Sequence, residues 1–205
     1  MAIVNGYATL AQIKSALRIP SADAVDDSLL EMAVSSASRL IDAYCGRSFT
    51  TAGTATRYYA THDPYLVQID DAREIVSVET SSGEDGIYDI AWDTTAHTGD
   101  VQPEPLNDYL GGLVWPFTRI RAIGDYVYPV DHETTVKVVA VYGWPNIPPT
   151  VTQATIIQSS RIFKRLDSPL GVAGFGDLGV MRVSRGLDPD VSQLIEGYRR
   201  FGGIA

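Results

Sequence analysis

The spacing of the apolar residues changes twice along this chain, and the order of the changes restricts the possible folds. Between residues 7 and 46, apolar side chains recur at intervals of three and four, which is the period of an amphipathic helix. Between residues 49 and 142, short runs rich in Thr, Tyr, Val and Ile are separated by turn-forming residues, which indicates β-strands. A helical period returns after residue 149. The sequence therefore predicts an α+β protein with helices on both sides of a β region along the chain.

Two helices are expected before the β region. The first spans residues 7–19, and Pro20 ends it because proline cannot continue the helical hydrogen bonds. The second opens with a capping box made by Ser28 and Glu31 and closes at Gly46, which is suited to a left-handed C-cap. Its apolar stripe is broad enough to face a core. The stripe consists of Leu29, Leu30, Ala33, Val34, Ala37, Leu40, Ile41 and Tyr44.

The β region contains several short strands separated by turns. Strands are expected near residues 54–61, 65–70, 74–80, 86–92, 118–122 and 134–142. The acidic pairs Asp70–Asp71 and Glu84–Asp85 fall where solvated turns are expected. The stretch from Thr94 to Pro116 is rich in glycine and proline, so it is predicted to leave the sheet as an irregular excursion that makes contacts. Trp115–Pro116 and Trp144–Pro145 suggest core-anchored turns, with an exposed tryptophan at an interface as the alternative.

Two more helices are expected after the β region. The third is capped by Thr150 and runs to about Leu166. The fourth has Asp188 as its cap and Pro189 in its first turn. Its buried face is made of Val191, Leu194, Ile195 and Tyr198. The segment 167–186 between these helices is rich in glycine and has no helical period, so it is predicted to be a long loop.

Residue types that support catalysis or cofactor binding occur only in unsuitable contexts. The string Gly174–Gly179 matches the G-x-G-x-x-G pattern of dinucleotide-binding turns, but no buried strand precedes it and no helix begins in it. His62, His97 and His132 are isolated and lack the spacing of a helical metal site. Hydrolase nucleophile motifs and a phosphate-binding loop are absent. We therefore expect no catalytic, cofactor-binding or metal-binding residues, and a protein that is not an enzyme.

Charge and cysteine content exclude further classes of protein. The formal net charge is −9 and the pI is about 4.7, which argues against a nucleic-acid-binding protein because phosphate contacts need clustered Lys and Arg. Cys45 is the only cysteine, so no internal disulfide can form and a buried structural thiol is expected. No signal-like segment opens the chain, and no apolar run approaches the ~18 residues of a membrane span. Synthesis in a reducing cytosol is expected.

Two stretches together carry a resemblance to a known family. In the first, a short helix at 7–17 is followed by an alanine-rich capped helix that ends in Gly46-Arg47-Ser48-Phe49 and leads to Thr56-Arg57-Tyr58-Tyr59. In the second, a strand ending in Val141-Tyr142-Gly143-Trp144 runs into Pro148-Pro149 and a helix. With these features in this order, the chain resembles the head-tail connector (adaptor, head-completion) proteins of long-tailed bacteriophages.

The resemblance implies a virion structural protein at the head-tail interface, made in the host cytoplasm. It implies a homo-oligomeric, dodecameric ring that docks on the portal protein, extends the DNA channel and offers the attachment surface for the next tail or neck component. DNA passes such a ring during packaging and ejection without sequence-specific binding. The implied fold is a four-helix bundle, with two N-terminal and two C-terminal helices and an inserted antiparallel β subdomain. The corresponding parts are 1–50, 51–143 and 144–205, forming one composite domain.

The same ring geometry suggests which residues make contacts. The glycine-rich loop at 167–186 is expected to project toward the channel or the tail. Its predicted contact residues are Phe175, Leu178, Val180 and Met181. The C-terminal segment is expected to reach the portal protein through Arg199, Arg200 and Phe201. No cofactor and no membrane are expected among the partners.

Two other hypotheses remain at this stage. A head-closure stopper or a tail terminator would share the acidity and the absence of active-site motifs, but such proteins are mainly β, whereas four helices are expected here. A small hydrolase or sugar-binding enzyme would need carboxylates that converge only in the folded protein, with strongly perturbed pKa values. Helix content and the surroundings of the carboxylates therefore discriminate among the three.

Overall fold

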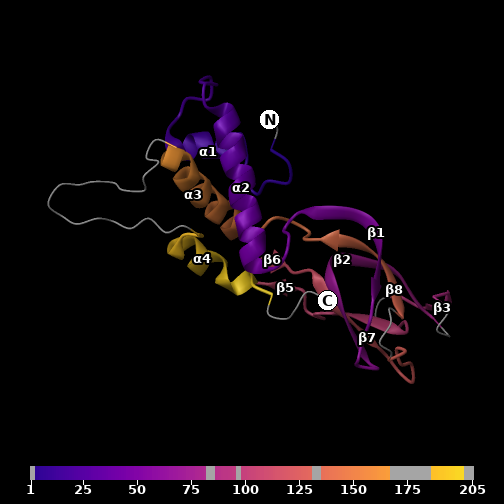
Figure 1. Ribbon diagram of the computed structural model, residues 1–205. Coiled ribbons are helices and arrows are strands. Elements are labelled where there is room, and N and C mark those ends of the chain that lie inside the picture. Colours follow the sequence, from indigo (N-terminus) through magenta and orange to yellow (C-terminus); the bar gives the residue numbers. More distant parts are fainter. Residues whose placement is uncertain (1–2, 82–85, 96–97, 131–134, 167–185, 201–205) are drawn as a thin grey trace. The chain divides into compact units, whose positions relative to one another are not determined.

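A computed structural model of the chain describes residues 3–81, 86–95, 98–130, 135–166 and 186–200 (Figure 1). These residues fall into two compact units. The helical unit combines residues up to Ser48 with the described residues of 147–202, whereas the β unit is continuous from Phe49 to Asn146. The chain therefore leaves the helical unit once, forms the β unit and then returns.

The helical unit begins with α1 (Leu10–Leu17) and α2 (Asp27–Cys45). Gly46 closes α2 with a φ of 64°, the left-handed conformation that glycine adopts without a steric penalty. The C-cap predicted from the sequence is therefore confirmed. After the β unit follow α3 (Pro149–Leu166), α4 (Pro189–Ile195) and the short 3-10 helix η1 (Glu196–Tyr198).

The capping box predicted at the start of α2 is wrong. The helix begins one residue before Ser28, after Asp26, so the Ser28 hydroxyl already lies inside the first turn and cannot cap it. A capping box is present on α1 instead, where the Thr9 side chain accepts from the Gln12 amide and the Gln12 side chain accepts from the Thr9 amide. The expected Asp188 cap of α4 is confirmed: its side chain accepts from the Asp190 amide at 3.0 Å.

Helices from before and after the β unit pack on one another. In Figure 1, α2 lies alongside α3, and α3 also contacts α1 and α4. One buried cluster at this packing joins Ala8, Ile13, Leu30 and Val34, with Ile3, Leu10, Leu17, Ile19, Ile156 and Phe163 against it. Segments more than a hundred residues apart in sequence thus share a core.

The buried face of α2 is displaced from the stripe predicted from the sequence. Leu29 and Leu40 are 39% and 40% exposed, whereas Ser38 is fully buried. Burial of Ser38 is possible because its hydroxyl donates to the Val34 carbonyl and accepts from the Tyr7 amide. Polarity alone therefore misplaced the boundary of the core face, and two leucines remain on the surface.

The β unit is built on one antiparallel sheet. Its strand order is β1-β8-β2-β7-β4, with β3 paired to β2, and β5 and β6 form a separate hairpin. The strands are β1 (Thr51–Tyr59), β2 (Leu66–Ser81), β3 (Tyr88–Trp92), β4 (Val101–Glu104), β5 (Tyr109–Leu110), β6 (Leu113–Val114), β7 (Phe117–Ala122) and β8 (Val136–Gly143). The predicted strands at 54–61, 86–92, 118–122 and 134–142 correspond to β1, β3, β7 and β8.

Two predictions for the β region are corrected by the sheet. The strands expected at 65–70 and 74–80 are one strand, β2, which changes register around Ala72 instead of turning. Asp70 and Asp71 therefore lie within a strand and not in a solvated turn. The stretch Thr94–Pro116 is also less irregular than predicted, because it contains β4, which pairs with β7, and the β5–β6 hairpin.

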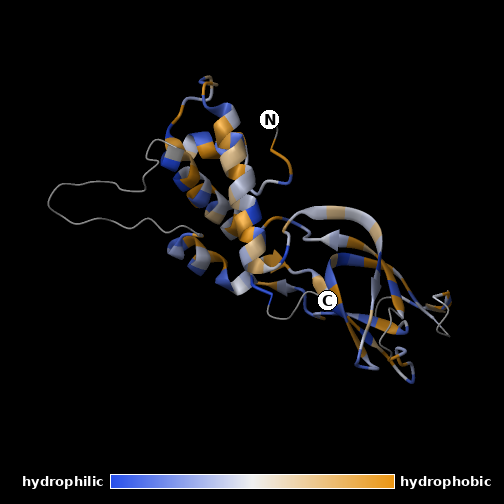
Figure 2. Cartoon of the chain, in the orientation of Figure 1, coloured by the Kyte–Doolittle hydropathy of each residue, from blue (hydrophilic) through white to orange (hydrophobic). Residues whose placement is uncertain are grey.

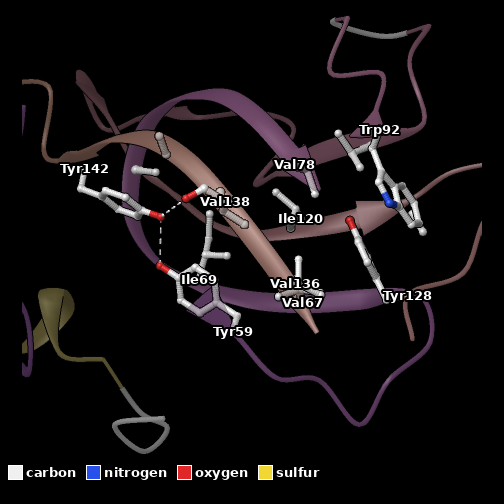
Figure 3. Packing of buried hydrophobic residues seen from close by; sticks show 14 residues of the cluster. Tyr59, Val67, Ile69, Val78, Trp92, Ile120, Tyr128, Val136, Val138 and Tyr142 are labelled. Atoms are coloured by element: carbon white, nitrogen blue, oxygen red, sulfur yellow. Dashed lines mark hydrogen bonds between the residues drawn. The ribbon is translucent and has the colours of Figure 1, made fainter. Parts of the chain in front are cut away.

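The interior of the β unit is rich in aromatic residues (Figure 3). The rings of Trp92 and Tyr128 stack with centroids 4.6 Å apart. Trp144 is fully buried, and its indole N–H donates to Asp71 at 3.0 Å. The expected core role of Trp144 is confirmed, and the strand position of Asp71 has a physical reason, since this carboxylate accepts a buried indole proton.

Hydrophobic and hydrophilic residues alternate along the strands and helices of both units (Figure 2). This alternation gives the strands and helices apolar faces that are available for packing. Among the described residues, no helix combines the length and the apolar character needed to cross a bilayer.

Candidate functional site

Two of the three predicted portal-contact residues lie in the described part of the chain. Arg199 and Arg200 follow η1, whereas Phe201 lies outside the described residues. The predicted loop contacts, Phe175, Leu178, Val180 and Met181, also lie outside them, as do the glycine string at 174–179, Glu84–Asp85, His97 and His132. The described part of the candidate site is therefore the segment that carries Arg199 and Arg200.

The start of α4 is fixed to α3 by polar contacts. The Arg161 guanidinium on α3 pairs with Asp188 and lies 3.5 Å from the Asp190 carboxylate. The Gln158 side chain, which is almost fully buried, accepts from the Asp188 amide at 3.2 Å. Proline at position 189 suits the first helical turn, whose amides need no intrahelical partner. These contacts fix the first turn of α4 against α3.

The end of α4 is attached to α2 by apolar and backbone contacts. Val191 and Ile195 are fully buried, and the Cys45 thiol lies 3.9 Å from the Ile195 carbonyl. One residue beyond η1, the Arg200 amide donates to the Cys45 carbonyl at 2.9 Å. This bond satisfies a carbonyl at the C-terminal end of α2, which has no partner within the helix. Arg200 is thereby held beside the end of α2.

A side-chain cluster completes this attachment, and we call Tyr44, Glu196 and Arg199 the C-terminal clasp. The Tyr44 hydroxyl donates to one oxygen of Glu196, and Arg199 donates to the other at 3.1 Å. The Arg199 guanidinium also lies 5.0 Å from the centroid of the Tyr44 ring. Hydrogen bonds from Tyr44 and Arg199 lower the pKa of Glu196, and the bond to Glu196 raises the pKa of Tyr44.

The clasp was only partly visible in the sequence. The sequence predicts Arg199 as a portal contact and places Tyr44 in the buried stripe of α2, whereas Tyr44 is only partly buried. Glu196 and Arg199 have the spacing of a helical ion pair, which is a readable signal. The partnership with Tyr44 is not readable because the two segments are 152 residues apart.

A second polar cluster lies within the β unit. Arg57 pairs with Asp70 at 2.5 Å and its guanidinium lies 4.0 Å from the centroid of the Tyr142 ring. The Tyr59 hydroxyl lies 3.1 Å from Asp70. It also lies 3.2 Å from the Tyr142 hydroxyl (Figure 3). Burial raises the pKa of Tyr59 and of Tyr142, so both stay protonated at neutral pH. This arrangement suits a structural network, because neither phenol is poised to exchange a proton.

Other candidate chemistry is not supported by the described residues. Within the described ranges, no group of three or more His, Cys, Asp or Glu is placed to hold a metal ion. Cys45 is fully buried, and burial raises the pKa of its thiol to about 12. The expectation of a buried structural thiol is confirmed.

Comparison with known proteins gives one family and one fold. Residues 7–80 match the family of phage gp6-like head-tail connector proteins. The resemblance to the head-tail connector family is thereby confirmed over the segment that contains α1, α2, β1 and nearly all of β2. No curated protein matches the chain.

Two solved structures share the fold of the whole chain. One chain comes from the neck of an empty gene transfer agent (GTA) particle computed with C6 symmetry, with a TM-score of 0.56 and 15% identity. The other comes from the virion of a native GTA particle, with a TM-score of 0.54 and 15% identity. Each match covers 100% of this chain and 95% of the other. The α+β fold is thus one that also occurs in proteins of GTA particles.

Proposed function

We propose that this protein is a non-enzymatic virion component, the head-tail connector that docks under the portal of a tailed phage or phage-like particle. The observation that carries the proposal is the match of residues 7–80 to the connector family, within a fold shared over the full chain with a neck protein. The matched family is one of head-tail connector proteins, and the two similar structures come from the neck and the virion of GTA particles.

The proposed architecture is a four-helix connector bundle with the β subdomain inserted between its second and third helices. Packing of α3 on α1, α2 and α4 supports this arrangement. In this proposal residues 1–50 and 144–205 form one composite domain with the inserted residues 51–143.

The protein is proposed to act as a dodecameric ring that extends the DNA channel during packaging and ejection. The similar GTA neck was computed with C6 symmetry, which agrees with cyclic assembly. The net charge of −9 suits a channel protein, because an acidic surface does not retain DNA. DNA is expected to pass without sequence-specific binding, and the ring offers a surface to the next neck or tail component.

The C-terminal segment is proposed to contact the portal protein. The clasp and the Arg200–Cys45 backbone bond support this, because they hold Arg199 and Arg200 at the end of the described chain. Phe201 follows them in sequence and is included in the proposed contact. Arg199 is engaged by Glu196 and Tyr44, so it positions the segment. The loop residues Phe175, Leu178, Val180 and Met181 are proposed to contact the channel or the tail.

A stopper or tail terminator fits the helices less well than a connector does. Such proteins are mainly β, whereas α2 and α3 alone contain 19 and 18 residues. Their packing on one another makes the helical unit a substantial part of the described protein.

Portal binding by matched charge-reversal variants tests this proposal. Arg200→Glu keeps the backbone bond to Cys45 but reverses the charge, so we expect portal affinity to fall at least about tenfold in an equilibrium binding measurement. Arg73→Glu, at an exposed position on β2, makes the same charge change and should leave affinity unchanged. Equal affinity of both variants would contradict the portal contact at Arg200. Failure of the unmodified protein to bind its portal would contradict the connector function.

A further inference from the structure

We propose that the β5–β6 hairpin of one copy docks on an outward-facing apolar stripe of α2 in the next copy. The inference rests on the proposed ring and identifies the surfaces that join neighbouring subunits. It follows from two exposed apolar features, one in each unit of the chain.

The first feature is the hairpin itself. Tyr109–Leu110 and Leu113–Val114 pair across Gly111 and Gly112, whose φ values of 63° and 81° give the tight two-residue turn that suits a twisted hairpin. This pair of strands is separate from the main sheet. Side chains added at either glycine would meet nothing within 4 Å, so the turn points into open space. The hairpin is therefore a projection and not part of the packed sheet.

Apolar side chains on and beside this projection are unusually exposed. Tyr109 and Leu110 are 67% and 69% exposed, Leu106 is 59% exposed and Val114 is 41% exposed. An isolated two-stranded hairpin is marginally stable in water. Clustering of large apolar residues on it is typical of a surface that is covered on association.

The base of the hairpin is nevertheless held firmly. The Trp115 amide donates to the Asp108 carbonyl at 2.6 Å, and its indole N–H donates to the Leu110 carbonyl at 3.4 Å. The Trp115 ring lies 5.1 Å from that of Trp144, which is fully buried. Trp115 therefore connects the hairpin to the core of the β unit, so the apolar tip is presented by a fixed support.

The second feature is a stripe on α2 that does not face the core of the helical unit. It is defined by Leu29, Met32, Ser36, Leu40 and Ala43. Spacings of three and four residues place these positions along one side of the helix. All are exposed, with Met32 at 52%, and Val25 just before the helix is 85% exposed.

This outer stripe is distinct from the other faces of α2. The core face carries Leu30, Val34, Ala37 and Ile41, all fully buried. A polar face follows Glu31, Ser35, Arg39 and Asp42. A surface helix needs only one apolar face to pack within its own unit. A second one on the outside is available for a separate partner.

A second copy of this chain fits both features at once. The hairpin is a narrow projection and the stripe is a helix side, so neither patch is suited to pair with itself across a two-fold axis. Two different complementary patches on one chain give head-to-tail contacts, the type of contact from which a cyclic ring is built when the rotation between neighbours closes. The residues that border the two patches have opposite charges. Asp108 lies beside the hairpin, and Arg39, which is half exposed, lies beside the stripe on α2.

Disulfide trapping between two single-site variants tests the contact in full-length protein. Leu110→Cys and Met32→Cys are prepared separately, one with an affinity tag, mixed with portal protein and gently oxidised. Native Cys45 is buried and its raised thiol pKa keeps it from competing. We expect a disulfide between the tagged and untagged chains only in the mixture. Val76→Cys, 47% exposed on β2, replaces Leu110→Cys as the matched control and should not be trapped with Met32→Cys.

The outcomes separate this contact from the ring proposal. The double variant should form covalent multimers up to the size of the ring. An intrachain disulfide without multimers, or trapping of Leu110→Cys only with itself, would overturn the contact. Portal-bound rings seen by electron microscopy without trapping would overturn the contact and leave the connector function intact. Absence of portal-bound rings in the unmodified protein would overturn the function instead.

A charge substitution provides a second, independent readout. Leu110→Asp places a charge in the proposed contact, and because this side chain is exposed, the circular dichroism spectrum should not change. We expect ring assembly to require at least about tenfold more protein. Val76→Asp is the control and should assemble normally. Normal assembly of Leu110→Asp would contradict the proposal.

Discussion

The two units of this protein differ in how the chain builds their interiors. The β unit is continuous from Phe49 to Asn146, and its core uses large aromatic rings and paired tyrosine hydroxyls. The helical unit draws its helices from both sides of that insertion and packs small and aliphatic side chains around them. One unit can therefore complete its core from a single continuous segment of the chain, whereas the other needs segments more than a hundred residues apart. The comparison predicts different responses to the same perturbations.

Separating the units should have the largest effect. A fragment of residues 49–146 should keep a cooperative thermal transition and the near-ultraviolet circular dichroism of its tryptophans, because all of its sheet partners are present. A fragment of residues 1–48 should lack stable helix, since α1 has 8 residues and α2 loses its α3 partner. Stable helix in the shorter fragment would contradict the proposal that the helical unit needs segments from both sides of the β unit.

The reactivity of the Cys45 thiol should report the unfolding of the helical unit alone. Burial raises the pKa of Cys45 from 9.0 to about 12, which lowers the thiolate fraction near neutral pH by about a thousandfold. We expect negligible reaction with a thiol reagent at pH 8 until denaturant opens the unit. All three tryptophans lie in the β unit, so fluorescence follows the other unit in the same titration. Rapid reaction of native protein would contradict the buried thiol.

The same pKa shift sets the sign of a pH effect. Folded protein holds the Cys45 proton more tightly than unfolded protein does, so its contribution to stability is intact below pH 9.0. That contribution is lost as the pH rises from 9.0 toward about 12. A Cys45→Ala variant should lack this part of the alkaline destabilisation.

Replacing the buried Lys14 should lower the stability of the protein more than replacing an exposed lysine. The Lys14 ammonium pairs with Asp27 and donates to the Asp23 and Ser21 carbonyls at 2.7 and 3.4 Å, so it fastens the connection between α1 and α2. Lys14→Met should lower the free energy of unfolding by about 2 kcal/mol, because the buried partners lose their donor. Lys164→Met, at an exposed position on α3, should change it by less than about 0.5 kcal/mol. Equal effects would show that these bonds contribute little.

Two tyrosine hydroxyls in the β unit should respond in different ways. Tyr59→Phe removes the hydroxyl that contacts Asp70 and Tyr142, and should cost about 1 kcal/mol in chemical denaturation. The Tyr128 hydroxyl is buried without a hydrogen-bond partner among the described residues, so Tyr128→Phe should be neutral or slightly stabilising. A larger loss for Tyr128→Phe would indicate a bridging water at its hydroxyl.

Local signals in the sequence were sufficient for much of the fold. Helix α2 and its Gly46 cap, the Asp188–Pro189 start of α4 and strand β8 each depend on residues adjacent along the chain. Their periods and capping preferences could therefore be read directly. The α+β class and the two expected sets of helices followed from the same signals.

Features that depend on distant partners could not be predicted. Asp70 and Asp71 resemble a turn in sequence, yet they lie in β2 because Arg57 and Trp144 engage their carboxylates. In the helical unit, Ser38 is buried because the Tyr7 amide, 31 residues away, donates to it. The clasp was only half predicted for the same reason, since Tyr44 meets Glu196 only after the chain has returned from the β unit.

Electron microscopy of the purified protein, alone and mixed with the portal protein of the same particle, would show directly whether the chain is a connector. We expect rings with an open centre that form on the portal and match its symmetry. Particles that stay small and never associate with the portal, even at high concentration, would contradict the proposed connector function.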